Sequence, residues 1–217
     1  MPAIVEADDE GMYVLKFRGA GQGPKALVAE LVAGELARAL GLSVPEIVFM
    51  ELDSDLARTE PDPEIQELIQ ASTGLNLALD YLPGSVMFDP LVESVDSELA
   101  SAIVWFDAYV TNVDRTARNT NMLMWHRKLR LIDHGAALYF HHSWSNYLER
   151  AHDKFSLIKD HVLLSSANNL READAQCSAK ITPELIRSIV NLIPDAWLRQ
   201  DDFFETGDQY RQAYFDY

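Results

Sequence analysis

Residues 111–142, "TNVDRTARNTNMLMWHRKLRLIDHGAALYFHH", combine polar side chains with two short apolar segments. The segments "MLMW" (122–125) and "LRLI" (129–132) have the composition of buried strands, and only "HRK" separates their cores. The stretch therefore predicts a hairpin, with its polar side chains at the ends of the strands and not within them.

Four polar side chains fall at the same end of this predicted hairpin: Asp114, Asn119, Asn121 and Asp133. Carboxylate and carboxamide oxygens suit hard cations such as Mg²⁺, which in turn bind substrate phosphates. Phosphoryl transfer uses such a metal, together with a second Asp that accepts the proton of the attacking hydroxyl. Turn capping is the alternative for the asparagines. Two acids at adjacent strand ends would repel without a cation or hydrogen bonds between them.

The composition is that of an ordinary globular protein. The 217 residues are 48% hydrophobic and 24% charged, so the chain can bury a full core as one domain or as two packed lobes. With 34 acidic against 18 basic residues, the net charge of −16 repels phosphate backbones. We therefore expect neither nucleic acid nor an anionic membrane as a partner.

Cys177 is the single cysteine, which excludes an internal disulfide and a thiolate metal site. The N-terminal residues carry acids where a signal peptide needs cations, and no run of about 18 apolar residues occurs. These features predict a cytoplasmic protein.

The order of predicted elements indicates an α+β fold of two lobes, residues 1–83 and 84–217, with a cleft between them. The N-terminal lobe is β-rich with one long helix, and the C-terminal lobe is mainly helical. The elements expected in the first lobe are a hairpin (2–17), the long helix (25–40), a strand (44–52), a short helix (60–72) and a strand from residue 74. Those expected in the second are a helix (97–112), the hairpin, helices near 153–164 and 182–193, and a tail after Pro194 packed on the surface.

The sequence resembles the HipA-like kinases, a family of protein-kinase-like fold. The blocks "YVLKF", "AELVAGELARALGLSVP", "NVDRTARNTN" and "LIDHGAALYFHH" are similar to successive blocks of that family, in the same order, over roughly residues 3–165. The resemblance implies an ATP- and Mg²⁺-dependent phosphotransferase whose acceptor is a hydroxyl group of a protein or a small molecule. Some relatives are toxins with an antitoxin partner, so a regulatory protein partner is also implied.

The resemblance further implies roles for residues of the first lobe. Lys16 matches the lysine that binds the ATP phosphates, and Glu30 matches its ion-pair partner. The segment "LDYLPG" matches the hinge that touches adenine, which assigns nucleotide contacts to Asp80, Tyr81 and Leu82.

In the second lobe, Asp114 matches the catalytic base and Asp133 the principal metal ligand. The metal-binding asparagine has two candidates. Asn119 has the family's spacing from Asp114, whereas Asn121 has the usual position immediately before the strand.

Two departures from the family pattern define alternatives. The phosphate-covering loop rich in Gly or Ser is replaced by "DDEG" at the first hairpin turn, and the later "RGAGQGPK" (18–25) reads as a flexible link into the long helix. An inactive kinase-like binding module is therefore one alternative. A His/Asp metallohydrolase is the other, because His134, His141 and His142 lie near the acids. As strand neighbours, however, the last two would point in opposite directions.

Overall fold

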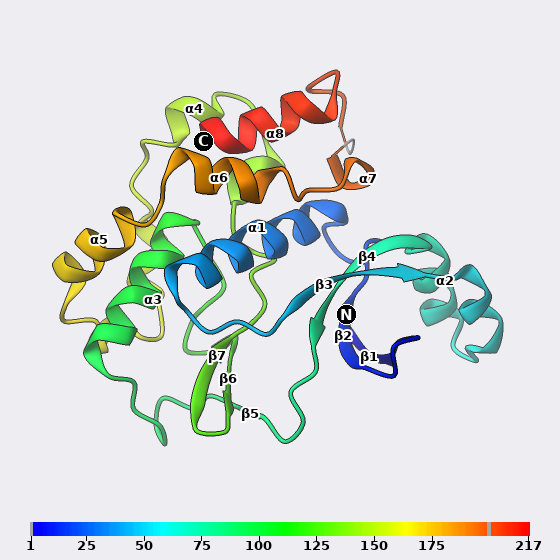
Figure 1. Cartoon of the computed structure of the whole chain (residues 1–217), viewed down its shortest axis with the longest axis horizontal. Helices are drawn as coiled ribbons and strands as arrows, with labels where there is room; N and C mark the ends of the chain where they lie inside the picture. The colour runs from blue at the N-terminus through cyan, green and yellow to red at the C-terminus, as the bar shows by residue number, and fades with distance from the viewer. Residues whose placement is uncertain (1, 199–200) are drawn as a thin grey trace.

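The computed structural model describes residues 2–198 and 201–217. Its fold is α+β, as predicted: a four-stranded antiparallel sheet and a three-stranded antiparallel sheet are joined to a larger helical region (Figure 1). None of the helices in these residues is long and apolar enough to span a membrane.

The four-stranded sheet contains the strands predicted for the first lobe, in the order β1 (Pro2–Glu6), β2 (Met12–Lys16), β4 (Gly74–Asp80) and β3 (Ile47–Leu52). The predicted hairpin is β1–β2, and its turn closes where the Ala7 N–H donates to the Gly11 carbonyl. Lys16 lies at the other end of β2, opposite Pro2 and Leu77. Four residues of strand, roughly 13 Å, separate it from the turn, so the "DDEG" turn does not cover Lys16.

The long predicted helix is α1 (Pro24–Leu40), which runs through the middle of the molecule (Figure 1). Proline at its first position suits a helix start, and Gly41, with φ +90°, ends it in the left-handed conformation that glycine adopts without strain. Its buried residues extend around most of its circumference. It is a core helix shared by the two lobes.

The described residues form two hydrophobic cores, and α1 belongs to the larger one, which also includes Leu77 and Leu79 of β4. The larger core joins α1 to α3 (Ser97–Tyr109), α6 (Pro183–Val190) and α8 (Gly207–Asp216). The smaller core fills the space between the four-stranded sheet and the short helix α2 (Pro63–Ala71). Glu30, on α1, is therefore held by the main core even though it belongs to the first lobe in sequence.

The hairpin predicted from residues 122–132 is β6 (Met122–Trp125) and β7 (Lys128–Leu131), with β5 (Val86–Met87) on its edge. The turn has two residues, His126 and Arg127, with φ of +48° and +63°. Positive φ at both positions is the geometry of the two-residue turns whose twist suits a hairpin.

The predicted helix at 153–164 is absent. The segment forms two 3₁₀ turns instead, η3 (Ser156–Asp160) and η4 (Leu164–Ser166). Its backbone pairs with the segment at residues 115 and 116, because the Val162 N–H donates to the Arg115 carbonyl at 3.1 Å beside a bridge between Thr116 and His161. A continuous helix could not make these contacts. The helix α4 (Tyr147–Arg150) precedes these two turns, and α5 (Leu170–Ser178) follows them.

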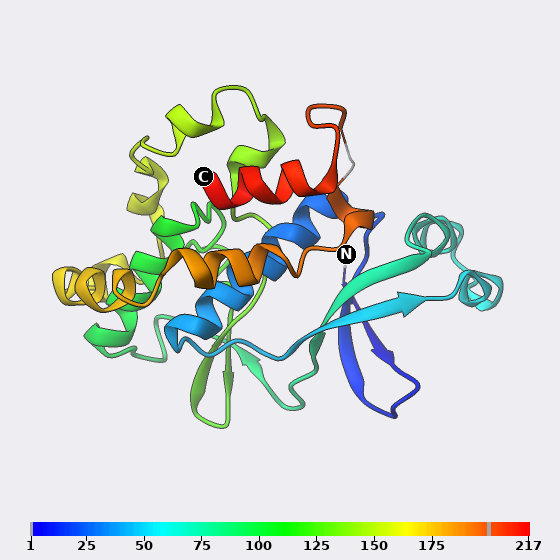
Figure 2. The same ribbon diagram turned by 45° about the horizontal axis from the view of Figure 1, so that its top comes forward.

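The tail after Pro194 packs as a helix on the outside of the main core, as expected, with one face of α8 buried and the other exposed. It forms α7 (Asp195–Leu198) and α8, and α6 contacts both α1 and α8 (Figure 2). Trp197 and Tyr210 are each 1% exposed, and the Trp197 indole N–H donates to the Leu75 carbonyl at 3.0 Å. The aromatic side chains are amphipathic, so they complete the main core while their polar atoms find partners.

Candidate active site

Three predicted residues from three different elements form one ion cluster. Lys16 Nζ at the end of β2 lies 2.5 Å from Glu30 Oε2 on α1 and 2.6 Å from Asp133 Oδ1 after β7. The Glu30 side chain is fully buried, whereas the Asp133 side chain is 53% exposed. The lysine thus joins a structural carboxylate in the core to a carboxylate that remains open to solvent and to ligands.

The charges in this cluster stabilise one another. Burial would raise the pKa of Glu30, but Lys16 and then His134 outweigh it and bring this pKa to about 2. Burial would lower the pKa of Lys16, but the carboxylates of Glu30 and Asp133 raise it above its ordinary value. His134 is fully buried, with Nδ1 3.3 Å from Glu30 Oε1. The lysine is therefore a permanent cation.

The predicted base, Asp114, is held by both candidate asparagines. The side-chain amides of Asn119 and Asn121 donate to its Oδ2 at 2.7 and 3.2 Å. Within the described residues, Asp114 Oδ1 and the two carboxamide oxygens make no hydrogen bond. These three oxygens remain available to a hydroxyl or a cation, and the geometry does not choose between the asparagines.

Two of these residues have left-handed backbone conformations. Asn121 has φ +47° and Asp133 has φ +56°. Asn and Asp tolerate this region better than other residues with a side chain, but such conformations persist only when the surroundings enforce them. Both occur where a hairpin strand meets the site.

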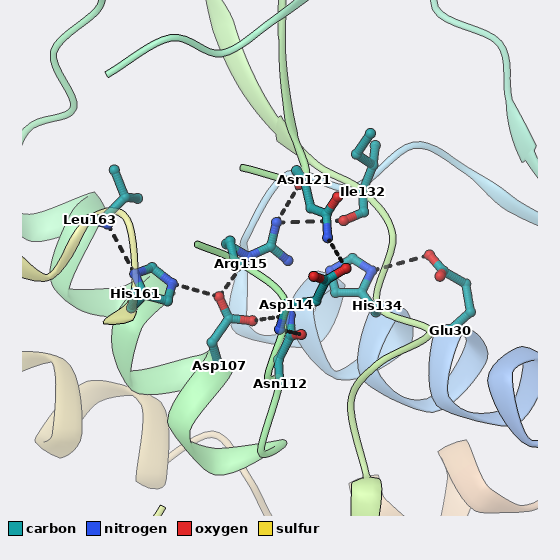
Figure 3. Close-up of polar contacts among 10 residues, drawn as sticks. All are labelled: Glu30, Asp107, Asn112, Asp114, Arg115, Asn121, Ile132, His134, His161 and Leu163. Carbon is teal, nitrogen blue, oxygen red and sulfur yellow. Dashed lines mark hydrogen bonds and ion pairs between the residues drawn. The ribbon is translucent and has the colours of Figure 1, made fainter. Parts of the chain in front are cut away.

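A buried polar network behind Asp114 was not predicted from the sequence (Figure 3). Arg115 Nε donates to Asp107 Oδ2 at 2.6 Å, and both side chains are fully buried. The same Asp107 oxygen lies 2.8 Å from His161 Nε2. Burial would raise the pKa of Asp107, but Arg115 and then His161 bring it to about 2. A signal was present: Asp107 is a charge within the apolar helix "ASAIVWFDAYV", and a buried charge needs partners.

Lys16, Asp114 and Asp133 line one cleft of about 280 Å³. Its wall also includes residues 20–22 of the glycine-rich segment 18–25. Within the described residues, the amides of Gly21 and Gln22 make no hydrogen bond to the backbone. Residues 20–22 therefore lie at the site, although the segment follows the lysine strand in sequence.

The predicted hinge residues lie away from this cleft. Asp80 ends β4 opposite Tyr13, three residues further along the strand pair than Lys16, and the Tyr81 N–H donates to the Met12 carbonyl at 3.0 Å. Asp80, Tyr81 and Leu82 are not among the residues that line the cleft around Lys16. Their contact with adenine stays a prediction.

The histidines are arranged differently from the expectation. Residues Tyr139–His142 form the 3₁₀ turn η2 and not a strand, so the rings of His141 and His142 lie 4.6 Å apart. Burial lowers the pKa of His141 far below its ordinary value, and its Nδ1 lies 2.9 Å from the Tyr214 hydroxyl. In the part of the chain that the structure describes, no group of three His, Cys, Asp or Glu side chains could hold a metal. The metallohydrolase alternative gains no support.

A buried Lys–Glu pair between sheet and helix, facing two acids at the ends of a hairpin, places the chain among kinase-like proteins. The chain belongs to the HipA-like kinase family, because the model of that family matches residues 1–213.

The structure is similar to that of CtkA, a proinflammatory kinase of Helicobacter pylori, with a TM-score of 0.61 over 99% of this chain and 88% of that chain. The identity is 15%, so this likeness shows the fold alone. No curated protein has significant similarity to the sequence.

Proposed function

We propose that this protein transfers the γ-phosphate of ATP to a hydroxyl group, with Mg²⁺ bound in the cleft that Lys16, Asp114 and Asp133 line. The observation that carries the proposal is the Lys16 cation, fixed between Glu30 and Asp133 at the wall of that cleft. The chain as a whole has a charge of −16. Because that field repels phosphates, a permanent local cation marks where phosphate could be held.

The donor set fits Mg²⁺. Asp133 presents a half-exposed carboxylate, and the carboxamide oxygens of Asn119 and Asn121 make no hydrogen bond within the described residues. Oxygen ligands of this kind, completed by water and phosphate, are what Mg²⁺ requires. When bound, the ion would neutralise the charge that develops on the transferred phosphoryl group. Asp133 with one of the asparagines would hold it.

Asp114 is suited to orient an acceptor hydroxyl and take its proton. Its Oδ2 is fixed by the two asparagines, and its Oδ1 is free of hydrogen bonds in the described residues. Fixing one oxygen orients the other, which is the positioning that a catalytic base needs. The unpaired amides of Gly21 and Gln22 would add hydrogen-bond donors for phosphate oxygens on the facing wall.

Calorimetric titration tests the proposal. ATP with and without Mg²⁺ is titrated into the wild type, into Asp133→Asn, and into Asp8→Asn, a control at an exposed residue of the remote β1–β2 turn. We expect Mg²⁺-dependent binding in the wild type and the control, and its loss in Asp133→Asn. Phosphate transfer is then followed by mass spectrometry, first on the protein's own hydroxyl groups and then on added acceptors.

Two results would oppose the proposal. Wild-type protein that binds no ATP in the presence of Mg²⁺ would favour a kinase-like module that works by contact. Binding that is unchanged in Asp133→Asn would remove the assigned metal ligand.

A further inference from the structure

One guanidinium connects the three chain segments that carry the proposed catalytic groups. Arg115 follows Asp114 directly, so its backbone belongs to the segment of the base. Its Nη1 donates to the Asn121 carbonyl and lies 3.5 Å from the Ile132 carbonyl (Figure 3). Asn121 is a candidate metal ligand, and Ile132 immediately precedes Asp133.

These two carbonyls are the points where the hairpin enters and leaves the site. The Ile132 N–H donates to the Asn121 carbonyl at 3.0 Å, so Arg115 contacts both residues of the last backbone hydrogen bond between the two strands. Asn121 and Asp133 lie at the end of the hairpin that faces the site, and both have positive φ. A guanidinium offers five donors in a rigid plane, which suits simultaneous contacts with a carboxylate and two carbonyls.

Asp107 and His161 fix the orientation of this guanidinium from behind. The Leu163 N–H donates to His161 Nδ1 at 3.0 Å, so the ring carries its proton on Nε2, which faces Asp107 Oδ2. Asn112 donates its side-chain amide to the other oxygen, Asp107 Oδ1, at 2.9 Å. Both oxygens of the Asp107 carboxylate therefore accept hydrogen bonds, and the carboxylate is oriented by Asn112, Arg115 and His161.

We propose that Asp107 and Arg115 are positioning residues for phosphoryl transfer, which set the distance between the base Asp114 and the candidate metal ligands Asn121 and Asp133. The inference rests on the proposed function. A buried ion pair is weak ground for a stability role, because well-packed apolar residues often stabilise a core as well or better. Two apolar residues in place of Asp107 and Arg115 could fill the same space, but they could not make the contacts of Arg115 with the two carbonyls.

The test separates positioning from folding by comparing a single with a double variant. Asp107→Asn leaves the Arg115 charge buried and unpaired, so it lowers the melting temperature and the transfer rate together. Asp107→Asn with Arg115→Met removes that charge, so the melting temperature recovers. We expect Mg²⁺ affinity and transfer rate to stay about 10- to 100-fold below wild type, the range for partners that orient metal ligands. If the Mg²⁺ affinity and the transfer rate both recovered together with the melting temperature, the proposal would be overturned.

Arg130→Met is the matched control, because Arg130 is on the same hairpin but donates to Ser43 and not to the site. It is expected to keep wild-type Mg²⁺ affinity. A loss equal to that of the double variant would show that any change in the hairpin has this effect, and would refute a specific role for Arg115.

Hydrogen exchange gives a readout that does not need activity. In the double variant, we expect amides in 119–123 and 131–135 to exchange about tenfold faster than in wild type, with those of α5 unchanged. Uniform acceleration, or none, would overturn the positioning role. If wild-type protein shows no Mg²⁺-dependent ATP binding, the proposed function fails, and the exchange result still decides whether Arg115 holds these segments.

Discussion

Glu30→Gln tests the central ion cluster, because it removes one buried charge with almost no change of shape. Glu30 is fully buried and accepts from Lys16 at 2.5 Å. Its pKa is about 2, against an ordinary value of 4.5. The difference of about 2.5, at about 1.4 kcal/mol for each pKa unit, corresponds to roughly 3 kcal/mol of folding stability at neutral pH. The variant should lose a stability of this order at pH 7.

The pH dependence follows from the direction of the change. A carboxyl group whose pKa is lower in the folded state stabilises the protein above its unfolded pKa, and this contribution is lost as the pH falls toward the folded value. For Glu30 the window lies between about pH 4.5 and pH 2. By pH 3 roughly 2 of the 3 kcal/mol is lost. The difference in the free energy of unfolding between the wild type and Glu30→Gln, called the gap below, should therefore narrow to about 1 kcal/mol at pH 3.

Urea unfolding followed by tryptophan fluorescence at pH 7, 5, 4 and 3 measures this gap. The control is Glu35→Gln on the same helix, where the carboxylate pairs with the partly exposed Arg38 at 3.0 Å. A partly exposed pair of this kind contributes below about 1 kcal/mol, so Glu35→Gln should lose less stability at pH 7 than Glu30→Gln. A gap for Glu30→Gln that stays constant from pH 7 to pH 3 would refute the reasoning, since it would mean that Glu30 does not titrate as a buried, paired carboxylate.

Three further predictions concern the base, a close packing contact and the tail. Asp114→Ala should lower phosphate transfer roughly 10²- to 10⁴-fold with ATP affinity unchanged in calorimetry; retained turnover would contradict its role as base. Gly19→Ala should destabilise the fold by about 1–3 kcal/mol in urea, because the added Cβ would lie 2.7 Å from Ala71 Cβ; unchanged stability would contradict this packing. Trp197→Phe removes the hydrogen bond to the Leu75 carbonyl and should cost about 1 kcal/mol; a melting temperature equal to wild type would show that bond to be immaterial.

The hairpin and its polar ends were predictable because strand alternation and turn position are local properties of the sequence. Residues 122–125 and 128–131 pair as expected, and this brings the neighbourhoods of Asp114 and Asp133 to the same cleft. The pairing of Lys16 with Glu30 was predicted only from the family resemblance. The two residues are 14 positions apart, and neither the 5-residue strand nor the 17-residue helix has a local pattern that indicates which of their residues will be in contact.

The network behind the site depends on contacts that no local pattern encodes. His161 reaches Asp107 across 54 positions, and its segment forms 3₁₀ turns where a helix was expected. Only the charge of Asp107 within an apolar helix hinted at such a partner. The choice between Asn119 and Asn121 was likewise not decidable, because the tight turn between Thr116 and Asn119 brings both carboxamides to one Asp114 oxygen.

The sequence predicted that the tail packs against the rest of the protein, but it did not indicate which elements the tail contacts. The buried residues of α8, Gly207, Tyr210, Ala213 and Tyr214, recur at helical spacing and form one face of the helix. Trp197 reaches the four-stranded sheet only because α7 follows the far end of α6 closely enough to contact α1.

The attachment of this tail to the beginning of the chain has a consequence for biosynthesis. Lys25, at the start of α1, pairs with Asp201 at 2.7 Å, across 176 positions of sequence. At about 5–20 residues per second, a ribosome needs roughly 9–35 s to deliver the second partner after the first. Until α6 and α7 have been synthesised, the apolar surface that α1 will bury against them has no native partner. We expect the emerging chain to depend on chaperone protection, and slowed translation of the last segments to lower the yield of soluble protein.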